Sequence, residues 1–301
     1  MEKRHFLASV VVLVAASLAF AQETAGVRQV KIGSLEVTAL QDGEVKLPPS
    51  LLQGTRPGEI ESTYGSAAPV STSVNAFLVR DGKHLVLVDT GGGPAYGGNM
   101  GHLAERLKQA GIDPAAIEAV LITHLHPDHF GGLVTADGKR AFPRAQLRLS
   151  RAEYDYWTNP ALETQMPAER KPMLNAVKAA LAPYQAEGAC RPFAPQEAPF
   201  PGVAAITTSG HTPGHTVYVF GSGKNSFWAI GDSVHFGAVQ FKHPEAGVMF
   251  DSDSSKAVAA RLELWNKAAK EGAVVGGAHL AFPGLGHVVA QKQGFEWQPL
   301  P

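Results

Sequence analysis

The sequence predicts an α+β fold in which two sheets pack together and helices cover their outer faces. Three observations lead to this prediction. Short apolar runs typical of strands alternate with helical patterns, and they follow the order strands, helices, strands, helix in two comparable halves. No internal repeat or low-complexity tract interrupts this order. With 301 residues, of which 45% are hydrophobic and 18% charged, the chain is long and apolar enough to bury a core.

The first half begins with a hairpin and a long loop. Residues 27–39 alternate as a hairpin does around a Gly-Ser turn, whereas residues 47–69 are rich in Pro, Gly, Ser and Thr and should be irregular. An Asp-Gly turn joins two strands, 75–80 and 84–88. The other predicted elements of this half are helices 103–110 and 114–118, strands 119–123 and 145–149, and helices 151–157 and 169–181.

The second half repeats this plan with fewer helices. A helix is predicted over 256–270, where apolar residues recur at helical spacing. The predicted strands are 203–207, 217–220, 226–230 and 273–276.

The N-terminus has the pattern of a secretory signal peptide. Residues 1–5 are basic, residues 6–20 are almost entirely apolar, and Ala19-Phe20-Ala21 has the A-x-A form of a cleavage site. We therefore expect residues 1–21 to be removed and residues 22–301 to form a single domain in the periplasm or outside the cell. The alternative is a retained membrane anchor, but the apolar run is short for a bilayer span. No membrane association is expected after cleavage.

Charge and cysteine content narrow the possible partners. The formal net charge is −1, so the chain has no basic excess that would favour nucleic acid or an anionic membrane. Cys190 is the only cysteine, which excludes an internal disulfide. It lies in the loop-like segment Gly188-Ala-Cys-Arg-Pro192 and has no histidine beside it, so we interpret it as a bystander.

A six-residue segment, His124-Leu-His-Pro-Asp-His129, holds the residues typical of a metal site. It follows the apolar strand 119–123, where the chain turns toward a helix. Imidazole and carboxylate groups are the ligands that zinc and similar cations prefer. His124 and His126 can point the same way if the backbone is extended, and Asp128 and His129 can point to a second position nearby. One segment can therefore begin two metal sites.

Three further residues complete the set. His211, Asp232 and His279 each follow an apolar strand and have glycine close by, and the carboxyl ends of strands are where open sheets place ligand sites. A lone histidine in such a place is usually a polar surface residue, but the preceding cluster makes a shared site the better interpretation. We predict two divalent ions, zinc by default with manganese, iron or cobalt compatible. The ligands would be His124, His126 and His211 for one ion and Asp128, His129 and His279 for the other, with Asp232 bridging. The additional histidines, for which second-shell or surface roles are expected, are His215, His235, His243 and His287.

The H-x-H-x-D-H motif with its later His, Asp and His resembles the metallo-β-lactamase superfamily. The resemblance implies an αββα sandwich of two mixed sheets with outer helices, and metals at one edge between the sheets. Longer strings resemble methyl parathion hydrolase and its lactonase relatives, which implies an exported homodimer. These strings are Gly210-His-Thr-Pro-Gly-His215, Gly231-Asp232, Ala238-Val-Gln-Phe241, Asp251-Ser-Asp-Ser254 and His279-Leu-Ala-Phe-Pro-Gly284.

The predicted activity is hydrolysis of lactones or aryl esters, with organophosphate triesters as additional substrates. The nucleophile would be a hydroxide shared by two cations, which lower the pKa of water from 15.7 toward about 7. Asp128 is the candidate catalytic residue, because it can orient this hydroxide or pass a proton to the leaving group. Asp89 and His215 are expected to orient ligand histidines, and the alternative is a turn-capping aspartate and a surface histidine.

The resemblance also places Tyr96, Trp157 and Phe250 on the wall of the substrate pocket. An aromatic, uncharged wall suits a neutral small molecule, whereas a glutathione thioester would need a basic cluster. True β-lactamases of the superfamily usually carry cysteine or serine where this chain has Asp232. The alternatives are a β-lactamase, a glyoxalase II-like thioesterase or a non-catalytic metal-binding module, and the complete ligand set disfavours the last.

Overall fold

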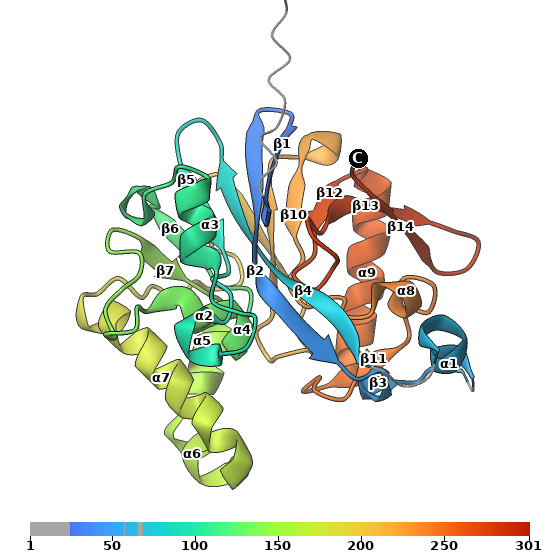
Figure 1. The fold of residues 1–301 in the computed structure, drawn as a ribbon, viewed down its shortest axis with the longest axis horizontal. Helices are drawn as coiled ribbons and strands as arrows, with labels where there is room; N and C mark the ends of the chain where they lie inside the picture. The colour runs from blue at the N-terminus through green and yellow to red at the C-terminus, as the bar shows by residue number, and fades with distance from the viewer. Residues whose placement is uncertain (1–24, 57, 66–68) are drawn as a thin grey trace, which may run out of the picture.

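A computed structural model describes residues 25–56, 58–65 and 69–301 of the chain. It confirms the predicted class: two six-stranded mixed sheets pack together, and helices lie on their outer sides (Figure 1). The predicted signal peptide, residues 1–21, lies outside the described residues. Within the described part of the chain, no helix is long and apolar enough to cross a membrane.

The first sheet is formed by the N-terminal half in the order β1-β2-β4-β5-β6-β7. Both predicted hairpins are present, and β2 and β4 extend well beyond the predicted strands. The last three strands are parallel to one another, so their carboxyl ends lie at the same edge. The strands are β1 (Val27–Ile32), β2 (Leu35–Leu47), β4 (Val70–Arg80), β5 (Leu85–Val88), β6 (Ala119–Leu121) and β7 (Gln146–Arg148).

The second sheet is formed by the C-terminal half in the order β14-β13-β12-β10-β9-β8. It contains two strands that the sequence did not predict, β13 and β14, which pair with each other at the edge. Its strands are β8 (Val203–Thr207), β9 (Thr216–Phe220), β10 (Phe227–Ala229), β12 (Val274–Gly276), β13 (Leu285–Ala290) and β14 (Phe295–Pro299).

Helices cover the outer face of each sheet. The predicted helices are present except that residues 114–116 form a 3-10 turn. No helix was predicted at Glu59–Tyr64, Gly93–Tyr96, Pro160–Gln165 or Gly237–Gln240, where the structure has short ones. The helices are α1 (Glu59–Tyr64), α2 (Gly93–Tyr96), α3 (Leu103–Gln109), α4 (Pro127–Phe130), α5 (Arg151–Thr158), α6 (Pro160–Gln165), α7 (Lys171–Ala186), α8 (Gly237–Gln240) and α9 (Ser254–Glu271). The 3-10 helices are η1 (Pro49–Leu51), η2 (Pro114–Ala116), η3 (Gly131–Leu133), η4 (Ala168–Arg170) and η5 (Gly223–Asn225).

The loop predicted over residues 47–69 is partly ordered into short elements. It contains η1, α1 and β3 (Leu52–Gln53), and β3 pairs with β11 (Gly247–Val248) as a small separate sheet. The prediction of irregular structure was therefore wrong for these residues, because an apolar cluster around Leu52 and Val248 gives the segment a surface to pack on.

The core between the sheets is built by strand alternation. Val86 and Val88 of β5 face inward, whereas Leu87 packs under the outer helices. Phe77 from the first sheet meets Phe227 from the second, with ring centroids 5.4 Å apart. These contacts fix the two sheets against each other and hold their loop-bearing edges together.

Candidate metal centre

The histidine segment lies between β6 and α4, as predicted. Proline at the first position of α4 starts the helix directly after His126, whose backbone is still extended at φ −88° and ψ 150°. His124 and His126 therefore precede the helix, while Asp128 and His129 lie in its first turn. The local geometry supports the expectation that this segment presents two groups of side chains.

All seven predicted ligands meet around Asp232. One carboxylate oxygen, Oδ2, lies 3.1 Å from His211 Nε2 and 3.5 Å from His124 Nε2. The other, Oδ1, lies 2.9 Å from His129 Nε2 and 3.3 Å from His279 Nε2. The two oxygens thus face the two predicted groups separately, as expected of a bridging carboxylate.

The remaining two predicted ligands, His126 and Asp128, lie on the cavity side of the two groups. His126 Nδ1 lies 3.0 Å from His211 Nε2, and Asp128 Oδ2 lies 3.4 Å from His279 Nε2. Three sets of ligand atoms among the described residues each lie within 4.8 Å of one another: His124, His126, His211 and Asp232; Asp128, His129 and His279; and Asp232, His235 and His279. The first two sets together hold the seven predicted ligands. Sequence segments more than 150 residues apart therefore share one site.

The donor set fits divalent cations. His124 Nε2, His129 Nε2 and Asp232 Oδ1 are fully buried and have no hydrogen-bond partner, although buried polar atoms are nearly always paired. Burial and the neighbouring charge of His211 lower the pKa of His126 to about 3, so its ring is neutral and keeps a lone pair. Buried imidazole nitrogens and a carboxylate oxygen without hydrogen-bond partners are donor atoms that a zinc-like ion can coordinate.

Glycine allows the ligand loops to approach one another. Gly231, just before Asp232, has φ +50°, and a Cβ there would lie 2.6 Å from His215 Nε2. Gly210, just before His211, has φ +137°, and a Cβ there would lie 2.1 Å from the backbone nitrogen of Ala257 in α9. A side chain at either position would push a ligand loop away from the site.

Asp89 contacts the ring nitrogen of His129 that does not face Asp232. Its Oδ2 lies 2.9 Å from His129 Nδ1, and its Oδ1 accepts a hydrogen bond from the Thr123 backbone N–H at 2.8 Å. Among the described residues, Asp89 is the only non-glycine residue with positive φ, at 60°. A strained backbone kept by hydrogen bonds is typical of a functional position.

His215 is buried beside the site, but its contact differs from the predicted one. Its Nε2 accepts a hydrogen bond from the backbone N–H of Asp232 at 3.0 Å, and its Nδ1 is 2.7 Å from Thr208 Oγ1. It therefore holds the backbone of Asp232 rather than orienting a predicted ligand histidine.

Two carboxylates were missed as parts of the site. Asp251 Oδ1 lies 2.9 Å from His211 Nδ1, and it stands in a string that the sequence analysis quoted without a role. Glu153 is fully buried and accepts from the backbone N–H groups of Leu125 and Gly214 and from the Thr212 hydroxyl. It ties the first histidine loop to the loop of His211, and the sequence shows only a glutamate in a helix.

Trp157 does not line the substrate cavity, which corrects its predicted place. Its side chain is only 3% exposed, and its Nε1–H donates to Glu153 Oε1 at 2.8 Å. The ring packs edge-on against His126 with centroids 6.4 Å apart. The α5 helix points it toward the core, so it supports His126 from behind.

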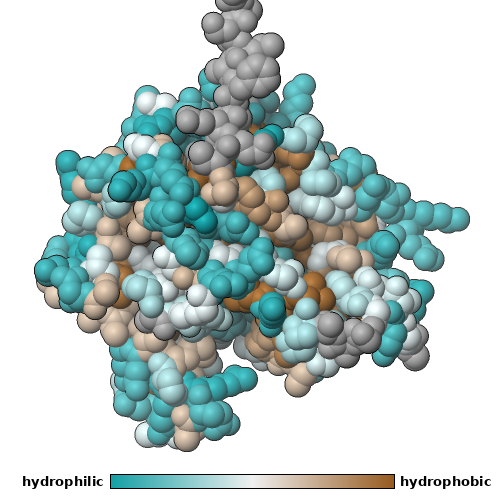
Figure 2. All heavy atoms as spheres, viewed as in Figure 1, coloured by the Kyte–Doolittle hydropathy of each residue, from teal (hydrophilic) through white to brown (hydrophobic). Residues whose placement is uncertain are grey.

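A cavity of about 380 Å³ opens over the ligands, and Tyr96 and Phe250 line it as predicted. In the space-filling view, the lower edge of the molecule is hollowed between the lobe of α6 and α7 and the region of α1 and β3 (Figure 2). The expectation of an uncharged wall was wrong, because Glu169 and Arg170 also line the cavity. The lining residues are Val45, Leu47, Tyr96, His126, Pro127, Asp128, Glu169, Arg170, Met173, Asp232, His235, Phe250 and His279.

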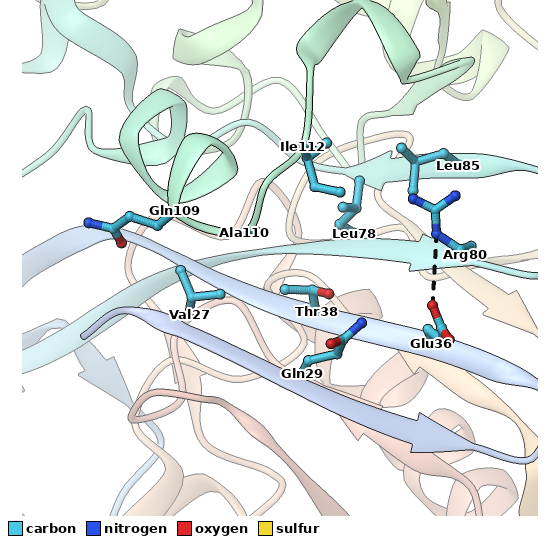
Figure 3. Close-up of a pocket in the computed structure, with 10 residues that line it drawn as sticks. All are labelled: Val27, Gln29, Glu36, Thr38, Leu78, Arg80, Leu85, Gln109, Ala110 and Ile112. Atoms are coloured by element: carbon cyan, nitrogen blue, oxygen red, sulfur yellow. Dashed lines mark ion pairs between the residues drawn. The ribbon is translucent and has the colours of Figure 1, made fainter. Parts of the chain in front are cut away.

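A second cavity of about 260 Å³ lies on the outer face of the first sheet, between β1, β2, β4 and the end of α3 (Figure 3). Glu36 and Arg80 form an ion pair across one end, with 3.8 Å between Arg80 Nε and Glu36 Oε2. No group of metal-ligating residues within the described ranges falls there. This cavity is separate from the histidine cluster.

The family follows from comparison with known proteins. Residues 71–279 match the metallo-beta-lactamase superfamily, and the chain belongs to this superfamily. The fold and the histidine–aspartate cluster define it as a metal-dependent hydrolase.

Two solved structures are similar over nearly their whole length. The hydrolase AbOPH of the beta-lactamase superfamily is 34% identical with a TM-score of 0.87, covering 93% of this chain and 99% of that chain. AidC, a dizinc quorum-quenching lactonase solved with the product N-hexanoyl-L-homoserine, is 27% identical with a TM-score of 0.80, covering 92% and 98%.

Similarity to curated proteins is confined to short segments. The chain is 33% identical over 81 residues to an atrochrysone carboxyl ACP thioesterase of Passalora fulva, covering 27% of this chain and 22% of that protein. It is 35% identical over 68 residues to the beta-lactamase-like protein 2 homolog of Drosophila melanogaster, covering 22% and 21%. These matches span only about a fifth of either relative.

Proposed function

We propose that the protein binds two divalent ions, zinc by default, and hydrolyses lactones or aryl esters, with organophosphate triesters as secondary substrates. The observation that carries the proposal is Asp232, whose two oxygens face two separate groups of histidines. The similarity to the dizinc lactonase AidC supports both the metal count and the lactone substrate.

The ligand residues would hold the ions through the nitrogen and oxygen atoms that converge on Asp232. Two bound divalent cations supply a water molecule activated at neutral pH and polarise the carbonyl oxygen of the substrate. Hydrolysis of a lactone breaks the acyl carbon–oxygen bond, so the departing alkoxide must receive a proton. The chain itself has to provide the group that carries this proton.

Asp128 is placed to carry the proton. It lines the cavity, and its side chain is 15% exposed, so a substrate can reach it. Burial would raise the pKa of Asp128, but the charges of His129 and His279 outweigh burial and hold that pKa below its ordinary value. The carboxylate therefore starts as a base that can take a proton from the attacking water and give it to the leaving oxygen.

The lining of the cavity supports this substrate class. Val45, Leu47 and Phe250 form an apolar side, and Tyr96 adds a phenol that is 45% exposed. Such a wall can bury an acyl chain or an aryl leaving group. Arg170 and Glu169 add polar contacts that suit an amide or ester group on the same substrate.

A substrate panel tests the proposal. Zinc-loaded protein is assayed on an acyl-homoserine lactone, an aryl lactone, an organophosphate triester and a cephalosporin, with chelator-treated protein as the control. We expect the two lactones to be hydrolysed fastest and the triester more slowly. Turnover of the cephalosporin alone would overturn the lactonase proposal.

A further inference from the structure

His235 lies within the metal centre but outside the set of predicted ligands. It follows Asp232 by three residues, is 4% exposed and borders the substrate cavity. Its Nε2 lies 2.9 Å from Asp232 Oδ2. The sequence indicated only an additional histidine, so the role of this buried ring has to come from its contacts.

The hydrogen bonds of the ring distinguish His235 from the predicted ligand His129. His129 donates its Nδ1–H to Asp89, and its Nε2 lies 2.9 Å from Asp232 Oδ1 without a hydrogen bond between these two atoms. The His235 ring nitrogen, in contrast, meets Asp232 Oδ2 in hydrogen-bond geometry. A carboxylate only accepts, so His235 Nε2 carries the proton and donates it. A neutral His129 ring, with its proton on Nδ1, would offer the Nε2 lone pair to an ion, whereas His235 directs an N–H at the carboxylate.

The surrounding loop fixes this ring in place. The backbone N–H groups of His235 and Phe236 both donate to Gln240 Oε1, at 2.8 and 2.9 Å. The buried guanidinium of Arg261 donates to the carbonyl oxygens of Ser233 and Ala246, so it ties both ends of the loop to α9.

Aromatic neighbours complete the restraint on the ring. His235 stacks on His279 at 5.0 Å with an interplanar angle of 22°, and Phe250 meets it edge-on at 4.8 Å. The ring therefore cannot swing away from Asp232 without displacing a predicted ligand or the cavity wall.

We propose that His235 is a positioning residue that holds the bridging carboxylate and thereby sets how tightly the metal ions are retained. Its Nε2–H fixes the rotation of the Asp232 carboxylate, so that each oxygen continues to face its own group of histidines. This inference depends on the proposed bridging role of Asp232. Loss of such an outer hydrogen bond typically weakens metal affinity about 10- to 100-fold.

Two substitutions at His235 separate its hydrogen bond from its bulk. His235→Gln places an amide N–H near the position of the imidazole Nε2, whereas His235→Ala removes the donor. His243→Ala is the matched control, because His243 follows α8 on the same segment but pairs with Glu59 outside the cluster. Zinc affinity and stoichiometry are measured by titration against a chromophoric chelator, and thermal unfolding of chelator-treated protein checks that each variant folds.

The expected result is that His235→Ala binds two zinc ions with affinity lowered about 10- to 100-fold, whereas His235→Gln and His243→Ala remain within a few-fold of the parent. Unchanged affinity in His235→Ala would overturn the inference. A loss of one ion in both His235 variants would overturn it too, because it would make His235 a ligand. Asp232→Ala is measured in parallel, since two tightly bound ions in that variant would reject the proposed site itself.

Discussion

The inner and outer ends of the substrate cavity are built in opposite ways. At the inner end, nearly every predicted ligand histidine is held by a second buried group, such as Asp89 on His129 or Asp251 on His211. At the outer end, Tyr96, Glu169 and Arg170 are exposed on short helices, and no ion pair within the described residues holds Glu169 or Arg170. From this difference we expect the proposed chemistry to be preorganised at the inner end and the recognition of substrate to be adaptable at the outer end.

Removing a ligand should break the inner end and give the largest effect. His126→Ala removes the predicted ligand that lies on the cavity side, next to His211. Turnover should fall on the order of 1000-fold, because metal catalysis supplies several kcal/mol and each 1.36 kcal/mol changes the rate tenfold. Steady-state kinetics with metal analysis measures this loss, and circular dichroism confirms that the fold is kept. Turnover equal to that of the parent would reject the metal mechanism.

Weakening a support should have an intermediate effect. In Asp89→Asn the new residue also tolerates positive φ. Its amide nitrogen, however, cannot accept the hydrogen bonds that Asp89 Oδ2 accepts from the His129 ring and the Thr123 hydroxyl. Metal affinity should fall about 10- to 100-fold with little change in secondary structure. Competition with a chelator measures the affinity. If the substitution left it unaltered, the buried network would not be what preorganises the inner end.

The titration of the metal-free cluster gives a third test. The pKa of His126 and that of His215 are lowered to about 3, chiefly by burial, so their contribution to stability is complete above the ordinary value of 6.5 and is lost as pH falls toward 3. Burial alone would lower the pKa of His211, but hydrogen bonds to Asp232 and Asp251 outweigh it and raise that pKa to about 9. Its contribution is therefore lost as pH rises from 6.5 to 9.

Metal-free protein should therefore be most stable near pH 6.5, as urea unfolding across this range would measure. Saturating zinc should remove the loss on the alkaline side, because metal-bound imidazoles carry no proton on the ligating nitrogen. A metal-free stability profile that rises steadily to pH 9 would contradict the charge assignment of His211.

Changes at the outer end should have the smallest effect and depend on the substrate. Arg170→Ala should raise KM a few-fold for lactones whose side chain carries an amide, since exposed polar contacts contribute up to about 1 kcal/mol. The kcat for these substrates and the KM for simple alkyl lactones should remain nearly unchanged. Lys171→Ala is the control, because Lys171 is the next residue but does not line the cavity. An equal effect of both substitutions would mean that Arg170 makes no specific contact.

The sequence predicted the inner end better than the outer end. The cluster from His124 to His129 is readable because adjacent residues share one loop, and Asp89 follows a strand directly. Trp157 was misplaced because aromatic character does not reveal which face of α5 is buried. Glu169 and Arg170 were missed because η4 reaches the cavity only through the way α7 packs.

By itself, the sequence determined the sandwich class, most of its strands and the seven residues that converge on one centre, because strand alternation and ligand chemistry are local properties of the chain. Only the tertiary structure decided that Asp232 turns one oxygen to each group, that His235 donates to it, and that Glu153 joins two loops. Those contacts join segments from both halves of the chain, and their geometry depends on how the two sheets pack rather than on any pattern within one segment.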